Sequence, residues 1–505
     1  MKKYNILFLI LFGSINDLSA QSFFDELNKN KIQPNTVVAS IDTISVTAEE
    51  FFYNYEYGPA FAKREKKSKD IFLNNMINEK LLALEAYAHG MFNDANTKNI
   101  YYDIEADIAS EELFKNEIYD KVQIKDSEIN KIAADKKCEL DIQWLYSKDE
   151  NKVDGYLKSL SNRISFDSLF NSQINDSVFA DQRSMRISLF NLIKKNNELA
   201  KIIDTMTVGN ASAKIITDDG FYIFKVVNKT TDLIKTESES NKLKKEAKEY
   251  LLKSKSDSLS EVYVNELIIK SKPIIKRDAF NILRSYLGKY ILNKDLYAEW
   301  ELDKKLESSL SNLGLTKNDK YPGINLIETN NGNIKLEDFI YWYNNREQYL
   351  KFNKSSRDEF SKSLDNYVWQ MLRDKLLSKQ AREKNYFDND WVKKQSEWWK
   401  DKIAYAALRD QYSKSIVLEN NEVSLENTNL TEKEKLNDKL SKKILYKILE
   451  LKKKYKITIN KQVLEKINIS SENNRKAIDF YTVKKDGLIP RPAFPSIDPD
   501  WANWQ

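Results

Sequence analysis

Apolar residues recur every three or four positions along most of this chain, a spacing that predicts amphipathic helices. The clearest such helix covers residues 71–87 and is followed by Gly90, a residue type that ends helices because it adopts positive φ easily. Before it, the β-branched run 37–46 predicts a strand, and Thr47 with Glu50 forms the capping box of another helix. Because only 11 glycines and 8 prolines occur in 505 residues, long helices with few tight turns are expected.

The second half of the chain repeats this order of elements. Met371–Asn385 aligns with Met76–Gly90 without a gap, and Asn385 stands at the position of Gly90. Asparagine is the next residue type to tolerate the left-handed conformation. The lysine-rich stretches 267–279 and 451–462 also correspond. We therefore predict an internal repeat of a helical lobe, with these boundaries: a first lobe at 21–136 with its closing helix at 232–280, a helical connector at 281–325 and a second lobe at 326–470.

The first lobe contains about a hundred residues that the second lacks, at 137–231. Here the pattern is mixed: residues 139–146 alternate as a strand, and 220–227 form a second clear strand. Helical patterns at 153–160, 165–170 and 197–204 lie between them. The segment therefore predicts a small inserted domain of strands and helices, and the whole chain is expected to be α+β and mostly helical.

The N-terminus has the layout of a secretory signal peptide. Lys2 and Lys3 precede a short apolar stretch, and small residues near Ala20 offer a cleavage site before Gln21. No later segment approaches the roughly 20 apolar residues that a membrane span needs. Cys138 is far from the cleavage site, so a lipid anchor on a processed N-terminal cysteine is not expected. We predict a periplasmic, soluble protein that is not a lipoprotein, with residues 1–20 as its signal peptide.

Composition argues against several classes of function. Lys and Arg number 81 and Asp and Glu 76, with both signs interspersed, so no basic stripe for nucleic acid is evident. His89 is the single histidine and Cys138 the single cysteine, which leaves too few ligands for an ordinary zinc site and no internal disulfide. His89 precedes Gly90 at a predicted helix end, where an imidazole is ordinary. Since no glycine-rich phosphate loop is present either, no metal and no cofactor are expected.

The order of these elements resembles the SurA/PrsA/PpiD group of parvulin-type foldases. Residues 77–90 resemble the N-terminal chaperone lobe of that group. The inserted domain resembles a parvulin-type (PpiC) peptidyl-prolyl isomerase domain, with its opening strand around 143–146, the helix start at 165–170 and the final strand at 220–226. The resemblance covers roughly residues 37–280 and, in the partial second copy, extends to about 470. It implies a fold of two SurA-like lobes and one parvulin-like domain.

The sequence departs from that family at the expected active site. In the parvulin family that the inserted domain resembles, the active site is an apolar pocket for proline beside two histidines. Here the two histidine positions hold Gln143 and Tyr222. The apolar pocket positions map to Phe190 and Leu199. Gln143 and Tyr222 could still hydrogen-bond each other or a peptide, so weak isomerase activity is conceivable. The resemblance therefore leaves open whether the chain is an enzyme, and we expect peptidyl-prolyl isomerase activity to be weak or absent.

A chaperone mechanism does not require that catalysis, because apolar client segments can bury against exposed aromatic side chains. The candidates for client contact form three groups of neighbouring aromatic residues: Phe51, Phe52, Tyr55; Tyr341, Trp342, Tyr343; and Trp398, Trp399. The tail at 471–505 holds four prolines, so we expect it to be extended, packed on its own lobe, acting as a pseudo-substrate or docking a partner.

The leading interpretation is a periplasmic chaperone for unfolded envelope, outer-membrane or secreted polypeptides, with no nucleic-acid partner and no membrane span. Two alternatives stay open: an active parvulin-type isomerase and a non-catalytic subunit of an envelope assembly. The identity of clients and the oligomeric state are not encoded in any recognisable pattern.

Overall fold

The computed structural model describes most of the chain, in seven ranges: 32–57, 67–174, 178–233, 236–316, 323–347, 350–419 and 430–469. The predicted signal peptide at 1–20 and the predicted tail at 471–505 lie outside them. Two compact units are present: a helical unit formed by Met1–Lys121 with Ser256–Gln505, and an inserted unit formed by Val122–Lys255. The chain is mostly helical with small antiparallel sheets, in agreement with the predicted α+β class. None of the helices in the described ranges is apolar over the length that a bilayer crossing requires.

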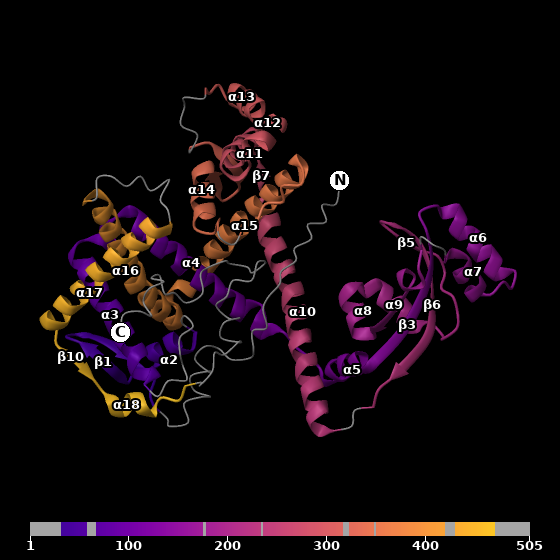
Figure 1. Ribbon diagram of the computed structural model, residues 1–505, viewed down its shortest axis with the longest axis horizontal. Coiled ribbons are helices and arrows are strands. Elements are labelled where there is room, and N and C mark those ends of the chain that lie inside the picture. The colour runs from indigo at the N-terminus through magenta and orange to yellow at the C-terminus, as the bar shows by residue number, and fades with distance from the viewer. Residues whose placement is uncertain are drawn as a thin grey trace. The chain divides into compact units, whose positions relative to one another are not determined.

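The first part of the helical unit begins with a hairpin and continues into three helices (Figure 1). Its elements are β1 (Val37–Ile41), β2 (Ile44–Thr47), α2 (Ala48–Tyr57), α3 (Ser68–Ala88), the 3-10 turns η1 (Met91–Asn93) and η2 (Tyr119–Lys121), and between them α4 (Ala95–Glu117). The predicted start of α2 is present in part. The Glu50 amide donates to Thr47 Oγ1 at 3.2 Å, but the Glu50 carboxylate turns to Lys80 instead of reaching back.

The remainder of the helical unit follows the inserted unit. Its elements are the end of α10 (Glu237–Ser271), β7 (Ile274–Ile275), α11 (Arg277–Ile291), α12 (Lys294–Glu299), α13 (Leu302–Asn312), β8 (Asn325–Thr329), β9 (Gly332–Lys335), α14 (Leu336–Asn344), α15 (Arg357–Glu383), η5 (Tyr386–Asp388), α16 (Asp390–Glu419), α17 (Leu430–Lys454), β10 (Ile457–Ile459) and α18 (Lys461–Lys466). Two sheets result, ordered β10-β1-β2 and β7-β8-β9.

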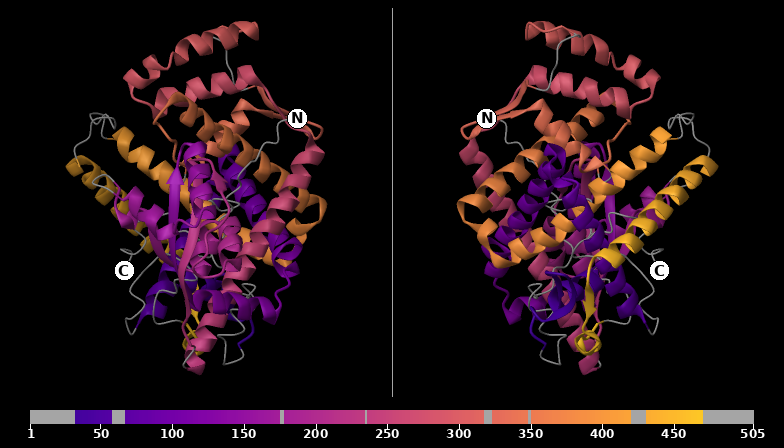
Figure 2. Two further views of the ribbon diagram at one scale, coloured as in Figure 1. Left: turned by 90° about the vertical axis from the view of Figure 1, so that its right-hand side faces the viewer. Right: turned by 90° about the vertical axis from the view of Figure 1, so that its left-hand side faces the viewer.

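Two separate hydrophobic cores stabilise the helical unit. The first core packs β1, β2, α2 and α3 against α16, α17 and α18. The second core packs β8, β9, α14 and α15 against α4, α11 and the end of α10. Figure 2 shows α16 and α17, orange and yellow, as a packed pair. Each core combines residues from both of the predicted lobes, 21–136 with 232–280 and 326–470.

The inserted unit is built on one four-stranded antiparallel sheet, ordered β4-β3-β6-β5. Its elements are α5 (Asp126–Lys137), β3 (Cys138–Ser147), α6 (Glu150–Ser161), α7 (Phe166–Gln173), η3 (Ala180–Gln182), β4 (Ser184–Ser188), α8 (Leu189–Lys195), α9 (Asn197–Thr205), β5 (Ile215–Thr217), β6 (Gly220–Thr231) and the first half of α10. The strands and helices predicted within 137–231 are all present. One sheet face packs on α8 and α9, and the other on α6 and α7.

Candidate functional site

Gln143 and Tyr222, the two positions expected to form a vestigial site, lie on opposite faces of the sheet. Tyr222 stands opposite Tyr146 across β3 and β6, and Gln143 stands opposite Lys225. Successive side chains of a strand point to alternate faces, so residues three apart, such as Gln143 and Tyr146, face away from each other. This placement rules out a hydrogen bond between Gln143 and Tyr222, which the sequence leaves open. Trp144, one position further along β3 than Gln143, lies on the same face as Tyr146 and Tyr222.

The face of Tyr222 carries a cluster of aromatic rings at one end of the sheet. The rings of Tyr146 and Tyr222 lie 4.8 Å apart, those of Tyr222 and Phe224 stack at 5.5 Å, and those of Trp144 and Phe224 lie 6.1 Å apart. The guanidinium of Arg183 lies 4.9 Å from the centre of the Tyr146 ring, a cation–π distance. Trp144, Tyr146 and Tyr222 are half-buried, so part of each ring remains accessible.

The turn between β5 and β6 holds both tyrosine hydroxyls in place. Tyr222 donates to Asp219 Oδ2 at 2.7 Å, and Tyr146 donates to the Asp219 carbonyl at 2.8 Å. Gly220 has φ of 151°, and a Cβ there would lie 2.7 Å from the Tyr146 ring, so the close approach of ring and turn requires glycine.

Neither the Tyr222 hydroxyl nor the Asp219 carboxylate is suited to exchange protons near neutral pH. Burial raises the pKa of the Tyr222 hydroxyl, and its hydrogen bond to Asp219 raises that pKa further. Hydrogen bonds from Thr217 and Tyr222 lower the pKa of Asp219. At neutral pH the tyrosine therefore stays a neutral donor and the aspartate stays ionised. The surface can stack on a proline or aromatic side chain, and it offers no general acid or base from this pair.

The other two predicted pocket residues are separated in the structure. Leu199 of α9 is half-buried and packs on the sheet face that also carries Tyr222. Phe190 of α8 instead packs with Ile132 and Ala247, and its ring lies 4.8 Å from that of Tyr250 on α10. Phe190 therefore helps to attach α8 to α5 and α10, and the predicted set of four does not form one pocket.

Seven of the eight aromatic candidates for client contact are buried. Phe51, Phe52, Tyr55 and Trp398 lie in the first core, and Trp342, Tyr343 and Trp399 lie in the second. In this conformation they stabilise the helical unit and expose less than a tenth of their surface, which corrects their placement as a client-binding surface. Tyr341 alone among the eight lines a groove at the surface.

That groove lies between α11 and α14 and has a volume of about 380 Å³. Its lining is mostly apolar and comprises Ile282, Leu283, Tyr286, Leu336, Glu337, Ile340, Tyr341 and Asn344. Beside it Tyr286 and Tyr290 keep 37% and 71% of their surface exposed, with ring centres 5.1 Å apart. This region is not among the sites predicted from the sequence, although Tyr286 and Tyr290 stand at a four-residue spacing on one face of the α11 pattern.

Further apolar side chains are exposed on the helices that precede β7 and β10. On α10 they are Leu259, Val262 and Ile269, and on α17 they are Leu445, Tyr446 and Leu449. Each helix buries its opposite side in a core, so each presents an apolar edge to solvent. Isolated apolar side chains are normal on protein surfaces, but rows of them along one helix mark interaction sites more often.

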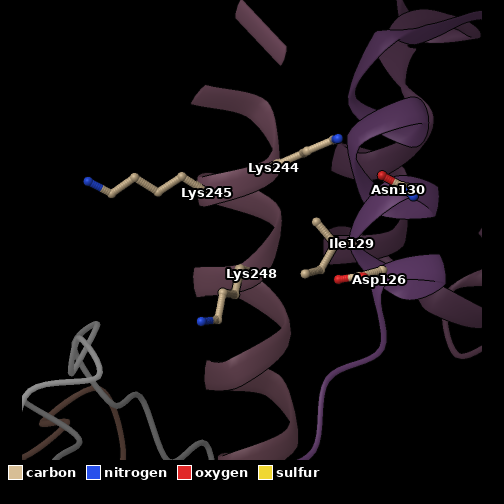
Figure 3. A pocket seen from close by; sticks show the side chains of 6 residues that line it. All are labelled: Asp126, Ile129, Asn130, Lys244, Lys245 and Lys248. Atoms are coloured by element: carbon tan, nitrogen blue, oxygen red, sulfur yellow. The ribbon is translucent and has the colours of Figure 1, made fainter. Parts of the chain in front are cut away.

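A basic pocket in the inserted unit lies between α5 and α10 and has a volume of about 440 Å³. Asp126, Ile129 and Asn130 line one side, and Lys244, Lys245 and Lys248 the other. Figure 3 shows that Lys244 reaches toward Asn130, whereas the Lys245 amine extends away from α5. These lysines are exposed and do not converge on a common point, so the pocket lacks the geometry of an anion site.

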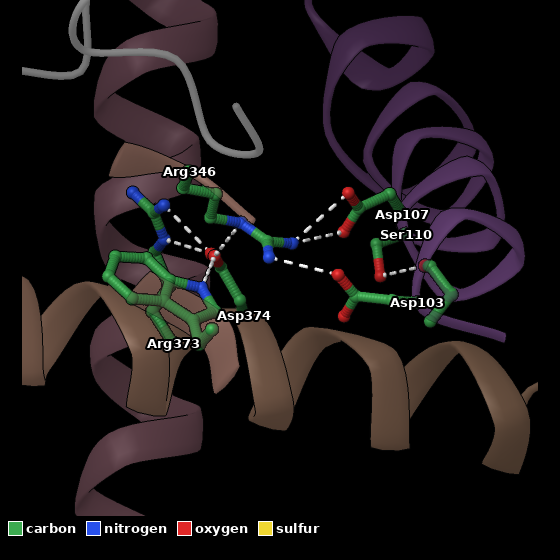
Figure 4. A network of polar contacts seen from close by, with 8 residues as sticks. Asp103, Asp107, Ser110, Arg346, Arg373 and Asp374 are labelled. Carbon is green, nitrogen blue, oxygen red and sulfur yellow. Dashed lines mark hydrogen bonds and ion pairs between the residues drawn. The ribbon is translucent and has the colours of Figure 1, made fainter. Parts of the chain in front are cut away.

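A network of buried charges in the helical unit links three of its helices. Arg346 follows α14 and binds Asp103 at 2.9 Å and Asp107 at 3.2 Å on α4, with Asp374 of α15 at 4.0 Å (Figure 4). Burial alone would lower the pKa of Arg346, but the three carboxylates outweigh burial and raise it. Trp342 also donates to Asp374 at 2.9 Å. The network therefore holds α4, α14 and α15 together as a structural element.

Comparisons with known proteins add little to this geometry. No family model matches the chain, and no curated protein matches it. Among solved structures, PrsA from Bacillus subtilis has 14% identity over 45% of this chain and 93% of its own, with a TM-score of 0.17. PrsA from Bacillus anthracis, a peptidylprolyl isomerase, has 14% identity over 49% and 99%, with a TM-score of 0.19. The foldase protein PrsA from Streptococcus pneumoniae has 12% identity over 55% and 94%, with a TM-score of 0.20. Similarity at this level establishes neither a shared fold nor membership of a family.

Proposed function

We propose that the protein is a chaperone of the cell envelope that binds unfolded polypeptides and has weak or no peptidyl-prolyl isomerase activity. The observation that carries this proposal is the apolar groove between α11 and α14 with the exposed Tyr286 and Tyr290 beside it. Covering an exposed Leu or aromatic side chain contributes about 1.5–3 kcal/mol, without demanding a particular client sequence. Such a surface suits non-native chains, which expose apolar segments that folded proteins bury.

The inserted unit supplies a second binding surface in this proposal. Trp144, Tyr146 and Tyr222 present partly accessible rings, on which a proline or aromatic residue of a client stacks. Rotation about a prolyl bond has a barrier of about 18–20 kcal/mol, and catalysis must stabilise the twisted amide in particular. An open row of rings binds both ground-state isomers and encloses neither, which is why weak or absent turnover is proposed.

The proposed site of action and the proposed class of clients rest on the sequence pattern and on the resemblance to parvulin-type foldases. The signal peptide at 1–20 would deliver the chain across the inner membrane, and SurA-like lobes would act there on outer-membrane or secreted polypeptides. This arrangement corresponds to the resemblance with parvulin-type foldases and is proposed together with the function.

The function is tested by aggregation of a denatured outer-membrane protein after dilution into buffer with and without the mature chain, followed by light scattering. We expect the protein to suppress scattering, and Tyr290→Glu to weaken suppression several-fold because it places a charge beside the groove. Tyr102→Glu is the matched control, since Tyr102 is also an exposed tyrosine, 57% accessible, on α4. Absence of suppression by the parent chain rejects the chaperone function, and equal loss in both variants rejects the groove.

The isomerase alternative is favoured by the aromatic row alone and is tested separately. Rates of cis/trans exchange in short Xaa-Pro peptides should rise little over the uncatalysed rate, and Trp144→Ala should remove any excess. Gln143→Ala should leave that excess unchanged, because Gln143 lies on the other face. A large, Trp144-dependent acceleration would instead make the protein an active isomerase.

The assembly-subunit alternative predicts one stoichiometric partner in a pull-down, whereas a chaperone captures many unfolded ones.

A further inference from the structure

We infer that the helical unit consists of two copies of one folding unit that exchange parts within a single chain. Each copy begins with a hairpin followed by two helices. These elements pack against three elements of the other copy: its third helix, its closing helix and its closing strand. The first copy comprises β1 through α4 and the end of α10 with β7. The second comprises β8 through α17 and β10.

The hairpins of the two copies have the same backbone bonds at corresponding positions. The Ala48 amide donates to the Thr36 carbonyl at 2.8 Å where the helix follows the first hairpin. The Leu336 amide donates to the Ile324 carbonyl at 2.9 Å at the corresponding point of the second. Each hairpin also carries a register irregularity in its first strand, after Val37 and after Asn325. Amphipathic pattern alone would not reproduce such details.

The long helices of the two copies end and restart in the same way. Gly90 has φ of 67° after α3, and Asn385 has φ of 63° after α15. Each is followed by one 3-10 turn, closed by a bond from the third residue after it: Asn93 to Gly90 at 2.9 Å and Asp388 to Asn385 at 3.0 Å. The buried positions also coincide, in these pairs: Met76 and Met371, Leu81 and Leu376, Leu82 and Leu377, Ala86 and Ala381, Ile108 and Ile403, Ala109 and Ala404, Leu113 and Leu408.

The closing strands are exchanged in the same register. β10 of the second copy pairs with β1 of the first, with Thr458 opposite Ser40. β7 of the first copy pairs with β8 of the second, with Ile274 opposite Glu328. Immediately after these pairs, the Asn460 amide donates to the Val38 carbonyl at 2.8 Å, and the Lys276 amide donates to the Leu326 carbonyl at 2.9 Å. Each hairpin thus has its outer edge satisfied by the other copy.

The third helices are exchanged as well. α3 packs against α16, and α15 packs against α4, whereas α4 and α16 pack on each other. Ala404 and Leu408 of the second copy lie in the first core, and the corresponding Ala109 and Leu113 of the first copy lie in the second core.

Charged residues at corresponding positions also meet across the copies. On one side Glu79 of α3 forms an ion pair with Lys402 of α16 at 2.5 Å. On the other side the corresponding residues are Asp374 of α15 and Asp107 of α4, both acidic, and Arg346 binds the two carboxylates. Both contacts therefore connect corresponding positions, one on the second helix of one copy and one on the third helix of the other copy.

The partner that each copy's hairpin and helices recognise is therefore a second copy of the same unit, supplied by the same chain. Exchange of identical elements between subunits is a known route to dimers, and here the connection through α11–α13 makes the exchange intramolecular. The inserted unit occurs between the third and closing helices of the first copy only. Because each core contains both copies, neither copy can form its core without the other.

The inference is tested with pairs of cysteines in the full chain, in a Cys138→Ala background. Two exchanged pairs, Ser40→Cys with Thr458→Cys and Glu328→Cys with Ile274→Cys, should oxidise to links within one chain. They would be seen as faster migration in non-reducing gels that a thiol reverses. The two matched controls join each hairpin to the closing strand of its own copy: Ser40→Cys with Ile274→Cys, and Glu328→Cys with Thr458→Cys. We expect these control pairs to stay reduced.

Three outcomes would overturn the inference. The first is a linked product from either control pair at a rate equal to that of the exchanged pairs. The second is failure of both exchanged pairs to link while circular dichroism shows folded protein. The third is linkage of the exchanged pairs mainly between two chains, which would place the exchange in a dimer. The two exchanged pairs are independent, so misfolding of one variant leaves the other informative.

Discussion

The two cores of the helical unit each have an ion pair at corresponding positions, but the pair is buried beside the first core and exposed beside the second. In the first core Lys80 of α3 binds Glu50 of α2 at 2.8 Å, with side-chain exposures of 10% and 7%. In the second core Lys375 of α15 binds Asp338 of α14 at 2.8 Å, with exposures of 42% and 32%. An ion pair at the surface contributes little, but removing one partner of a buried pair leaves an uncompensated charge. Equal distances therefore do not imply equal contributions to stability.

The charged contacts between the exchanged helices also differ between the two cores. The first core needs only Glu79 and Lys402, of opposite charge, whereas the second brings two aspartates together and requires Arg346 between them. The second core thus depends on one side chain that the first does not need.

Loss of Arg346 should have the largest effect. Arg346→Met removes the cation that Asp103, Asp107 and Asp374 share, although Arg373 still binds Asp374 at 2.8 Å, and we expect the free energy of unfolding to fall by about 3 kcal/mol. Urea unfolding followed by circular dichroism measures this. Arg357→Met, at a half-exposed arginine paired with Asp358, is the control and should change stability by less than about 0.5 kcal/mol. A loss below about 1 kcal/mol for Arg346→Met would show that the network is not structural.

Lys80→Met and Lys375→Met compare the two corresponding ion pairs directly. Lys80 also binds Asp401 of α16 at 2.8 Å, so its removal leaves two carboxylates and should cost about 3 kcal/mol. Lys375→Met should cost less than about 1 kcal/mol. Burial raises the pKa of Glu50 although Lys80 opposes it, so the Lys80→Met deficit should shrink as falling pH protonates that carboxyl. Equal losses at neutral pH would contradict the difference in burial.

Glu117 should make the free energy of unfolding depend on pH in the acidic range. Hydrogen bonds from Lys121 at 2.6 Å and Lys384 at 2.8 Å lower the pKa of Glu117 to about 2. A carboxyl whose pKa is lower in the folded state stabilises above its ordinary pKa of 4.5, and this contribution disappears as pH falls toward 2. We expect Glu117→Gln to cost about 1–2 kcal/mol at pH 7 and almost nothing near pH 2. Urea titrations across that range test this, with Glu337→Gln at an exposed glutamate as the control.

The smallest effects should come from the two helix ends. Gly90→Ala forces a side chain into φ of 67° and should destabilise by about 1 kcal/mol. Asn385→Gly relieves the same strain at φ of 63°, so it should be neutral or stabilise by a few tenths of a kcal/mol. Thermal unfolding of both variants measures the difference. Destabilisation by Asn385→Gly that equals that of Gly90→Ala would mean that Asn385 has a contact beyond its backbone conformation.

Local pattern was sufficient for the elements but not for the candidate site. The strand around residues 139–146 was expected and is present as β3, yet the match of Gln143 to a family position placed it on the wrong face. A shift of one residue reverses the face of every side chain, and no local signal fixes that register. The aromatic groups around Phe51, Trp342 and Trp398 were equally ambiguous, because a ring on an amphipathic helix fits a core and a binding surface alike.

The sequence by itself determined the mostly helical α+β class, the helix ends at Gly90 and Asn385, and the strands of the inserted unit, since these depend on periodicity and backbone preference within a few residues. Only the tertiary structure decided which hairpin receives which closing strand and which aromatic rings are buried. Two segments with nearly the same pattern fit either hairpin locally. Their actual partners are selected by packing and charge contacts between residues hundreds of positions apart.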